Sequence, residues 1–121
     1  DGSTLMNLGS LGTVGRVMPA NLIILVWDNE KWAQTGYQAS HTAYGTDLES
    51  VARATGFKKT STVSNEEDLD LIFAQALAEP GPWYIVAKIQ EQEYLPVAPV
   101  EPEATLHRFR STFVDERKRI G

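Results

Sequence analysis

The feature that most constrains the fold is a continuous apolar run at residues 21–27, NLIILVW, which is followed directly by Asp28 and Asn29. Runs of this length are typical of strands that are buried on both faces, as in parallel sheets packed between helices. Helical and strand-like segments alternate along the chain as far as residue 89. This alternation predicts an α/β fold, a parallel sheet with helices on both faces and helical crossovers between its strands.

Apolar spacing and capping residues place the other expected elements. We expect one helix over residues 3–17, capped by Ser3, with its apolar side on leucines at helical spacing. Gly9, Gly12 and Gly15 form a row along it, and glycine inside a helix costs up to about 1 kcal/mol, so the row predicts close approach of another backbone. The remaining expected elements are a helix at 47–55 starting at Asp47, a strand at 59–63, a helix at 66–78 capped by Ser64 or Asn65, and a strand at 83–89.

Proline marks a change of organisation toward the C-terminal end. Three prolines lie within residues 96–103, which we expect to be an extended linker. The segment at 104–119 that follows has the apolar spacing of an amphipathic helix. We therefore divide the chain into a partial cofactor-binding domain at residues 1–95 and a Pro-rich linker with a C-terminal helix at 96–121.

Composition excludes several classes of function. A net charge of −5 argues against nucleic acid as a partner, because no basic stripe is available to neutralise phosphates. The chain has no cysteine, which excludes disulfides, thiolate metal sites and a cysteine nucleophile, and agrees with a cytoplasmic location. The longest apolar run falls far short of the roughly 20 residues that a membrane helix needs, so we expect no membrane partner.

Two segments with oxygen ligands are expected at one edge of the sheet. Asp1 opens the first helix and Asn29 follows the apolar strand, and ligands of open α/β sheets bind beyond the carboxyl ends of the strands. Mg²⁺ prefers octahedral oxygen ligation, through one or two carboxylates together with substrate phosphates. We expect Asp1 to offer a carboxylate, Asn29 an amide oxygen and Lys31 its main-chain carbonyl. Gly2 would let the backbone approach a diphosphate, and Ser3 would donate its hydroxyl.

These residues resemble the thiamine diphosphate motif, whose family pattern is Gly-Asp-Gly, then somewhat under thirty residues, then Asn, often as Asn-Asn. The first glycine would precede Asp1, and Asp28 stands where the first Asn of the pair is common. The strings DGSTLMNLGSLGTVG, NLIILVWDNEKW and HTAYGTDL are similar to the branch with phosphonopyruvate decarboxylase and the β subunit of sulfopyruvate decarboxylase. The resemblance extends to about Ile89, and Tyr37 replaces a second glycine that is common in this branch.

The resemblance implies that the chain is the diphosphate-binding part of a larger enzyme, truncated before Asp1, with thiamine diphosphate and Mg²⁺ as cofactors. It implies a partner pyrimidine-binding domain or subunit that carries the activating glutamate, and a homo- or hetero-oligomer. Trp32 would help to bind the cofactor, and Thr35 would form part of the active-site wall. His41 would orient a 2-oxo acid or protonate the enamine, or else be a loop histidine bonded to backbone.

We therefore expect a decarboxylase acting on a small 2-oxo acid, a 3-substituted pyruvate such as sulfopyruvate or phosphonopyruvate. One alternative within the enzyme class is carboligation, as in members similar to acetolactate synthase, or oxidation of an aldehyde. An alternative of another class is a catalytically inert binding or assembly module, because the chain alone lacks the activating glutamate. Product analysis separates the first two, and cofactor binding by the isolated chain tests the third.

Overall fold

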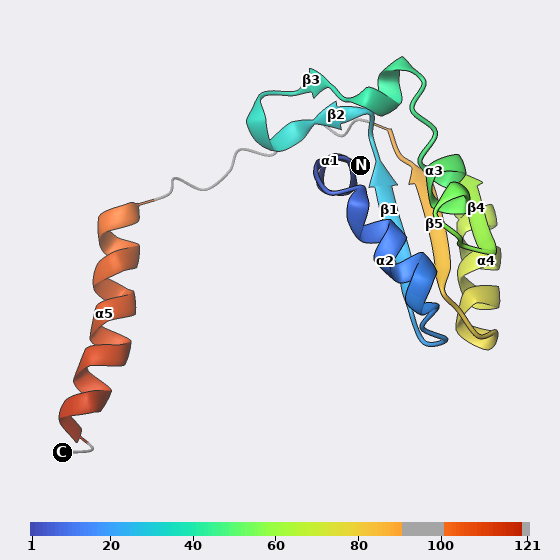
Figure 1. The fold of residues 1–121 in the computed structure, drawn as a ribbon. Coiled ribbons are helices and arrows are strands. Elements are labelled where there is room, and N and C mark those ends of the chain that lie inside the picture. The colour runs from blue at the N-terminus through green and yellow to red at the C-terminus, as the bar shows by residue number, and fades with distance from the viewer. Residues whose placement is uncertain (91–100, 120–121) are drawn as a thin grey trace. The chain divides into compact units, whose positions relative to one another are not determined.

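The structure is a computed structural model that describes residues 1–90 and 101–119. The chain divides into two units, residues 1–91 and 92–121, and each is described here by itself (Figure 1). The first unit contains the sheet and its helices, and the second contains helix α5 (Pro102–Arg119). The expected boundary after residue 95 and most of the Pro-rich linker fall outside the described residues, so this division of the chain stays a prediction.

The main sheet has three parallel strands, β1 (Ile23–Asp28), β4 (Lys59–Val63) and β5 (Trp83–Lys88), in the order β1-β5-β4. Strand β5 therefore occupies the centre, with a parallel partner on each side. The register pairs the last residue of β1, Asp28, with the last residue of β5, Lys88. The expected parallel α/β sheet is confirmed, and two oppositely charged side chains meet at its carboxyl edge.

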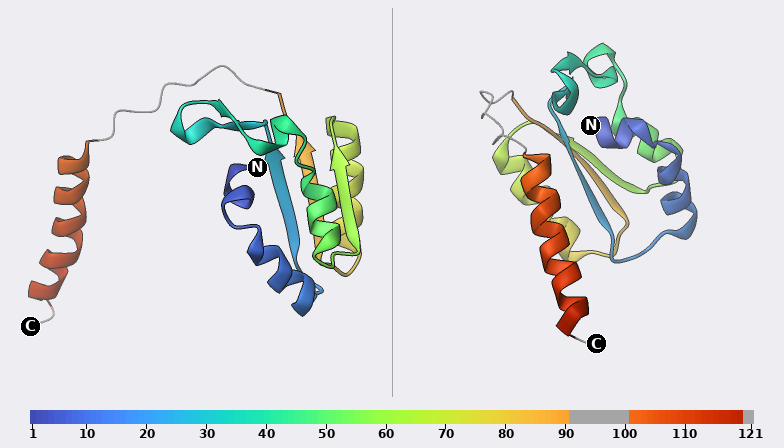
Figure 2. Two further views of the ribbon diagram at one scale, coloured as in Figure 1. Left: turned by 45° about the horizontal axis from the view of Figure 1, so that its top comes forward. Right: turned by 90° about the vertical axis from the view of Figure 1, so that its left-hand side faces the viewer.

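Helices cover both faces of this sheet, as expected (Figure 2). Helices α1 (Gly2–Met6), α2 (Gly9–Val17) and α3 (Leu48–Ala54) lie on one face, and α4 (Glu66–Ala78) lies on the other. The core on the first face consists of Leu11, Val26, Leu48, Ala52, Phe57, Tyr84 and Val86. The core on the second face consists of Val63, Ala76, Trp83, Ile85 and Ala87. Alternate residues of β5 thus supply both cores, as the two-residue period of a strand requires.

The expectation that residues 21–27 form a strand buried on both faces was wrong. The strand is β1, and only Val26 and Asp28 in it are buried, while Trp27 is 51% exposed. Among the described residues β1 pairs with β5 alone, so it lies at an edge of the sheet. The central, doubly covered position belongs to β5, in which five of six residues are buried. The apolar run therefore predicted a strand correctly, but the strand is not buried on both faces.

The single helix expected over residues 3–17 is two helices, α1 and α2, separated at Asn7 and Leu8. Asn7 leaves the helical region with φ −145° and ψ 56°, and asparagine favours such breaks because its side chain competes for local backbone bonds. Leu5, Leu8, Leu11 and Val14 nevertheless pack on the first core, as the spacing predicted. Ser3 is not the cap: α1 begins at Gly2 and Asp1 holds the N-cap position.

The glycine row is explained at one position only. A Cβ atom on Gly15 would lie 1.9 Å from the carbonyl oxygen of Thr55, so the backbones of α2 and the end of α3 touch there. A Cβ atom on Gly12 would meet nothing within 4 Å, and one on Gly9 only the side chain of Asn7. The predicted close approach of another backbone is therefore confirmed at Gly15 and wrong at Gly9 and Gly12.

Four short elements, two strands and two 3-10 turns, connect β1 to α3. Strands β2 (Lys31–Trp32) and β3 (Gln38–Ala39) form an antiparallel pair, connected through the 3-10 turn η1 (Ala33–Thr35). A second 3-10 turn, η2 (His41–Tyr44), leads to α3. The amide of Ser40 donates to the carbonyl of Glu30 at 2.8 Å. This bond holds the residues after β3 against the turn that follows β1.

Side chains cap helices α3 and α4, which connect the parallel strands, as expected. Asp47 accepts from the amide of Ser50 at 3.0 Å at the start of α3, and Asn65, rather than Ser64, accepts from the amide of Asp68 at 2.8 Å at the start of α4. In the second unit, α5 begins two residues earlier than the predicted helix and exposes Leu106 and Phe109. None of the helices in the described part of the chain is long and apolar enough to cross a membrane.

The contact at Gly15 gives a matched pair of substitutions in one helix. Gly15→Ala should lower the free energy of unfolding by about 2–3 kcal/mol, because α2 must move away from Thr55 to admit the methyl group. Gly12→Ala should raise it by up to about 1 kcal/mol, because alanine is the better helix former and its methyl group meets open space. Urea unfolding followed by circular dichroism measures both, and equal effects of the two substitutions would contradict the backbone contact.

Candidate functional site

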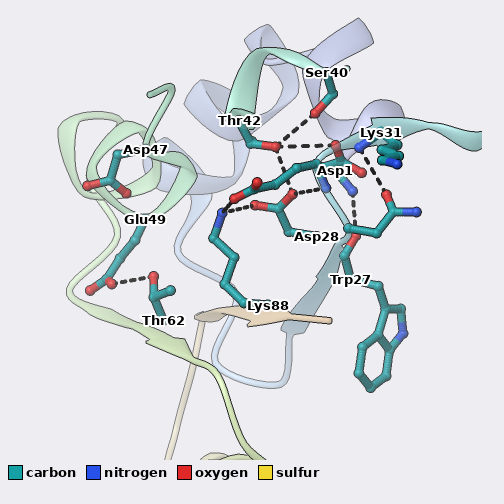
Figure 3. A network of polar contacts seen from close by, with 12 residues as sticks. Asp1, Trp27, Asp28, Lys31, Ser40, Thr42, Asp47, Glu49, Thr62 and Lys88 are labelled. Atoms are coloured by element: carbon teal, nitrogen blue, oxygen red, sulfur yellow. Dashed lines mark hydrogen bonds and ion pairs between the residues drawn. The ribbon is translucent and has the colours of Figure 1, made fainter. Parts of the chain in front are cut away.

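Polar side chains gather at the carboxyl edge of the sheet, where β1 and β5 end side by side (Figure 3). The main-chain nitrogen of Asp1 donates to the carbonyl of Trp27 at 2.6 Å, which holds Asp1 against the end of β1. Asn29 and Lys31 follow directly after the same strand. The three expected metal ligands are therefore at one edge of the sheet, on the first helix and on the turn after β1.

The turn after β1 is built by two successive side-chain bonds to backbone. The amide of Glu30 donates to Asp28 Oδ1 at 3.0 Å, and the amide of Lys31 donates to Asn29 Oδ1 at 3.1 Å. Glu30 adopts a left-handed conformation with φ 61°, which these bonds help to hold. An amide oxygen has two acceptor positions, so Asn29 Oδ1 keeps one for a further ligand while its turn fixes its direction.

Asp28 is the buried centre of the cluster, with its side chain 1% exposed. Lys88 Nζ lies 2.8 Å from its Oδ2, and the hydroxyl of Thr42 donates to its Oδ1 at 2.7 Å. Burial alone would raise the pKa of this carboxyl, but the bonds from Lys88, Thr42 and the Glu30 amide outweigh it and hold the pKa below its ordinary value. Asp28 is therefore a carboxylate whose acceptor positions are taken up by protein groups.

Lys88 is shared between two carboxylates. Its Nζ also lies 2.7 Å from Glu30 Oε1, so one ammonium joins the end of β5 to both sides of the turn after β1. Partial burial lowers the pKa of Lys88, and the bonds to Asp28 and Glu30 raise it more, so the net shift is upward. The Lys88 ammonium is thus paired with both Asp28 and Glu30.

A chain of hydroxyl groups reaches the cluster from η2. Ser40 and Thr42 are both buried, and their hydroxyl oxygens lie 2.8 Å apart. The Thr42 hydroxyl oxygen is also 3.4 Å from Asp1 Oδ2, so it stands between the Asp1 and Asp28 carboxylates (Figure 3). One threonine side chain therefore joins η2, the end of β1 and the start of α1.

Trp32 packs against the helix that carries Asp1. A Cβ atom on Gly2 would lie 2.9 Å from the indole ring, so glycine is needed there to admit Trp32. The structure thus adds a reason for Gly2 besides the expected approach of a diphosphate. The ring of His41 meets Trp32 edge-on, with ring centres 5.9 Å apart and an interplanar angle of 84°. His41, Trp32 and Gly2 therefore form one row beside the acidic cluster.

The other residues predicted from the family pattern lie on the hairpin or the first helix. The Thr35 hydroxyl donates within its own turn, either to the carbonyl of Trp32 at 3.4 Å or to Gln38 Oε1 at 3.2 Å. Tyr37 has φ 63°, in the left-handed region where glycine is favoured, which fits the second glycine common at this place in the resembling branch. Ser3 is exposed on α1. The roles expected for Thr35 and Ser3 stay predictions.

Sequence reasoning missed Ser40, Thr42 and Lys88. Lys88 had a signal, since it is the one charged residue in the apolar segment at 83–89 and lies next to the end of that segment. Ser40 and Thr42 lie in a polar loop where no periodic pattern marks a buried hydroxyl. Within the described residues, no three His, Cys, Asp or Glu side chains gather as a metal-binding group. The protein's share of a cation site here would therefore mix carboxylate, amide and carbonyl oxygens.

Known proteins match most of the chain. The family described as "Thiamine pyrophosphate enzyme, C-terminal TPP binding domain" matches residues 1–87. This range includes every residue described above at the carboxyl edge of the sheet except Lys88. The chain belongs to this family. Its thiamine diphosphate-binding fold, expected from the resemblance of the motif, is thereby confirmed.

Several individual proteins of known name are similar to this chain. The chain is 40% identical over 110 residues to sulfopyruvate decarboxylase subunit beta of Methanococcus maripaludis, covering 90% of this chain and 58% of the relative. It is 43% identical over 88 residues to the same subunit of Methanocaldococcus jannaschii, covering 73% and 46%. It is 38% identical over 113 residues to phosphonopyruvate decarboxylase of Streptomyces viridochromogenes, covering 92% and 28%. The chain thus spans about half the length of the two β subunits.

Removal of the lysine tests the buried ion pair. Lys88→Met should lower the free energy of unfolding by about 2–3 kcal/mol at neutral pH, because it leaves the Asp28 carboxylate buried without its cation. Urea unfolding measures the loss. Lys59→Met, which breaks the more exposed Lys59–Glu79 pair, is the matched control and should cost much less.

The loss of stability in Lys88→Met should depend on pH. Because the folded-state pKa of Asp28 is lowered, its interactions stabilise the fold above the ordinary carboxyl pKa and are lost as pH falls through the folded-state value. The difference between the protein and Lys88→Met should therefore be largest near neutral pH and shrink as the pH falls below about 4. A difference that stays constant with pH would contradict the ionised pair.

Proposed function

We propose that this chain holds Mg²⁺ and the diphosphate end of thiamine diphosphate in an enzyme that decarboxylates a small 2-oxo acid. The observation that carries the proposal is the placement of Asp1 against the end of β1, beside the turn that bears Asn29 and Lys31. These residues offer a carboxylate, an amide oxygen and a main-chain carbonyl. This donor set suits a hard cation whose remaining positions are filled by phosphate oxygens and water.

The electrostatics of the edge support the same assignment. Asp28 and Glu30 are joined to Lys88, whereas Asp1 makes no contact with that ammonium among the ion pairs of the described residues. The Lys88 ammonium therefore does not take up the acceptor positions of the Asp1 carboxylate. Gly2 and Trp32 would then shape the wall beside the diphosphate, with the indole fixing the start of α1.

The substrate class follows from the relatives. Two of them are named as sulfopyruvate decarboxylase subunits and one as a phosphonopyruvate decarboxylase, so we assign a 3-substituted pyruvate with a second anionic group as the substrate. The bound cofactor supplies the carbanion chemistry, while protein groups position and polarise. His41, beside Trp32, would orient the 2-oxo acid or give a proton to its product, and Thr35 would line the wall.

The complete enzyme in this proposal has a second part. A pyrimidine-binding domain or subunit would carry the glutamate that activates the cofactor, and the name "subunit beta" of the relatives supports a hetero-oligomer. A cytoplasmic location is part of the proposal, and the absence of cysteine agrees with it.

The assay is release of CO₂ by the complete enzyme from sulfopyruvate and from phosphonopyruvate, with and without thiamine diphosphate and Mg²⁺. We expect turnover of at least one substrate that requires both cofactors. Asp1→Ala and Asn29→Ala should each lower the affinity for Mg²⁺ in the presence of cofactor by about 100-fold or more, since each removes a ligand. Isothermal titration calorimetry measures that affinity independently of turnover.

Asp47→Ala is the matched control, because it removes a carboxylate that caps α3 and is not bonded to the acidic edge. It should lower stability by about 1 kcal/mol and leave the affinity for Mg²⁺ unchanged. Formation of a new carbon–carbon bond in place of net CO₂ release from these substrates would favour the carboligase alternative. No binding of cofactor and Mg²⁺ by the complete enzyme would overturn the proposal.

A further inference from the structure

We propose that Thr42 is a positioning residue that keeps the Asp1 carboxylate available to a divalent cation by donating its hydroxyl proton to Asp28 instead. The inference rests on the proposed function, in which Asp1 is a metal ligand. Thr42 contacts both carboxylates, at 2.7 Å from Asp28 and 3.4 Å from Asp1, and lies in neither of the segments that carry the expected ligands.

Proton counting fixes the direction of the bonds. A threonine hydroxyl has one proton to donate and can accept two, and a carboxylate paired with an ammonium only accepts. The Thr42–Asp28 distance of 2.7 Å is that of a normal O–H···O bond, so the proton of Thr42 lies on this contact. Ser40, 2.8 Å away, must then be the donor to Thr42. The chain of bonds runs from Ser40 to Thr42 to Asp28.

Asp1 is left without that proton. At 3.4 Å from the Thr42 oxygen, Asp1 Oδ2 lies beyond the 2.5–3.0 Å range of hydroxyl hydrogen bonds. The contact therefore limits where the Asp1 carboxylate can lie without occupying its acceptor positions. The Lys88 ammonium is likewise bonded to Asp28 and Glu30. Asp28 thus accepts both the Thr42 proton and the Lys88 ammonium, and neither of these two donors is bonded to Asp1.

The position of Thr42 in the fold lets its side chain limit where the Asp1 carboxylate lies. Thr42 is buried in η2, and the amide of Ser40 is bonded to the carbonyl of Glu30, so the hydroxyl chain is anchored to the turn that bears Asn29. Loss of the hydroxyl would break the bond between η2 and Asp28, so that the side chain at position 42 would no longer be held beside Asp1. Groups that orient metal ligands in this way change metal affinity by about 10- to 100-fold when they are removed.

The test uses the complete enzyme and titrates Mg²⁺ at saturating thiamine diphosphate by calorimetry. Thr42→Val, which keeps the shape but removes the hydroxyl, should weaken Mg²⁺ binding by about 10- to 100-fold. Thr42→Ser should restore binding to within about threefold, because it keeps the donor. Thr42→Ala carries the same expectation as the valine variant and covers the case in which valine disturbs folding.

Thr62→Val is the matched control. The Thr62 hydroxyl donates to Glu49 Oε2 at 2.6 Å, a threonine–carboxylate bond between β4 and α3 that is separate from the cluster (Figure 3). It should shift the melting temperature but not the affinity for Mg²⁺. An affinity of Thr42→Val no lower than that of Thr62→Val would overturn the inference, as would failure of Thr42→Ser to restore binding. Failure of the unmodified enzyme to bind Mg²⁺ and cofactor would instead overturn the proposed function.

Discussion

The pairing of Asp28 with Lys88 is the interaction on which the functional edge depends. It joins the ends of two adjacent parallel strands, and the same carboxylate also fixes the turn after β1 through Glu30 and the turn η2 through Thr42. A buried carboxylate is costly unless its partners are complete, so these elements hold one another in place. The cation ligands proposed for this domain then lie on segments whose geometry is already determined by the pair.

Asp28 and Asp1 are neighbouring acids that differ in burial and in their bonded partners. Asp28 is buried and accepts bonds from Lys88, Thr42 and the amide of Glu30, so it fixes the turn after β1 and the turn η2. The Asp1 carboxylate lies beside it, 3.4 Å from the Thr42 hydroxyl oxygen, and in the proposed function it is the acid that binds the cation. The two acids have the same side-chain chemistry, and their burial and bonded partners give them different electrostatic environments.

Much of this fold was predictable from local patterns. The strand at Lys59–Val63, the helix at Glu66–Ala78 and the caps at Asp47 and Asn65 follow from periodicity and local hydrogen bonding, which sequence records directly. The order of strands was not predictable, since β1 and β5 are both apolar and only tertiary packing decides which is central. Asp1 and Asn29 were predicted as ligands through a motif, whereas Thr42 was missed because its contact to Asp28 spans a polar loop without a repeating pattern.

The most direct measurement is a crystal structure of the complete enzyme with thiamine diphosphate and Mn²⁺ in place of Mg²⁺, with the metal located by its anomalous scattering. We expect one peak beyond the end of β1, bonded to the carboxylate of Asp1, the amide oxygen of Asn29 and the carbonyl of Lys31, with Asp28 still paired to Lys88. A metal bonded to Asp28, or one placed away from Asp1, would contradict this assignment of the ligands.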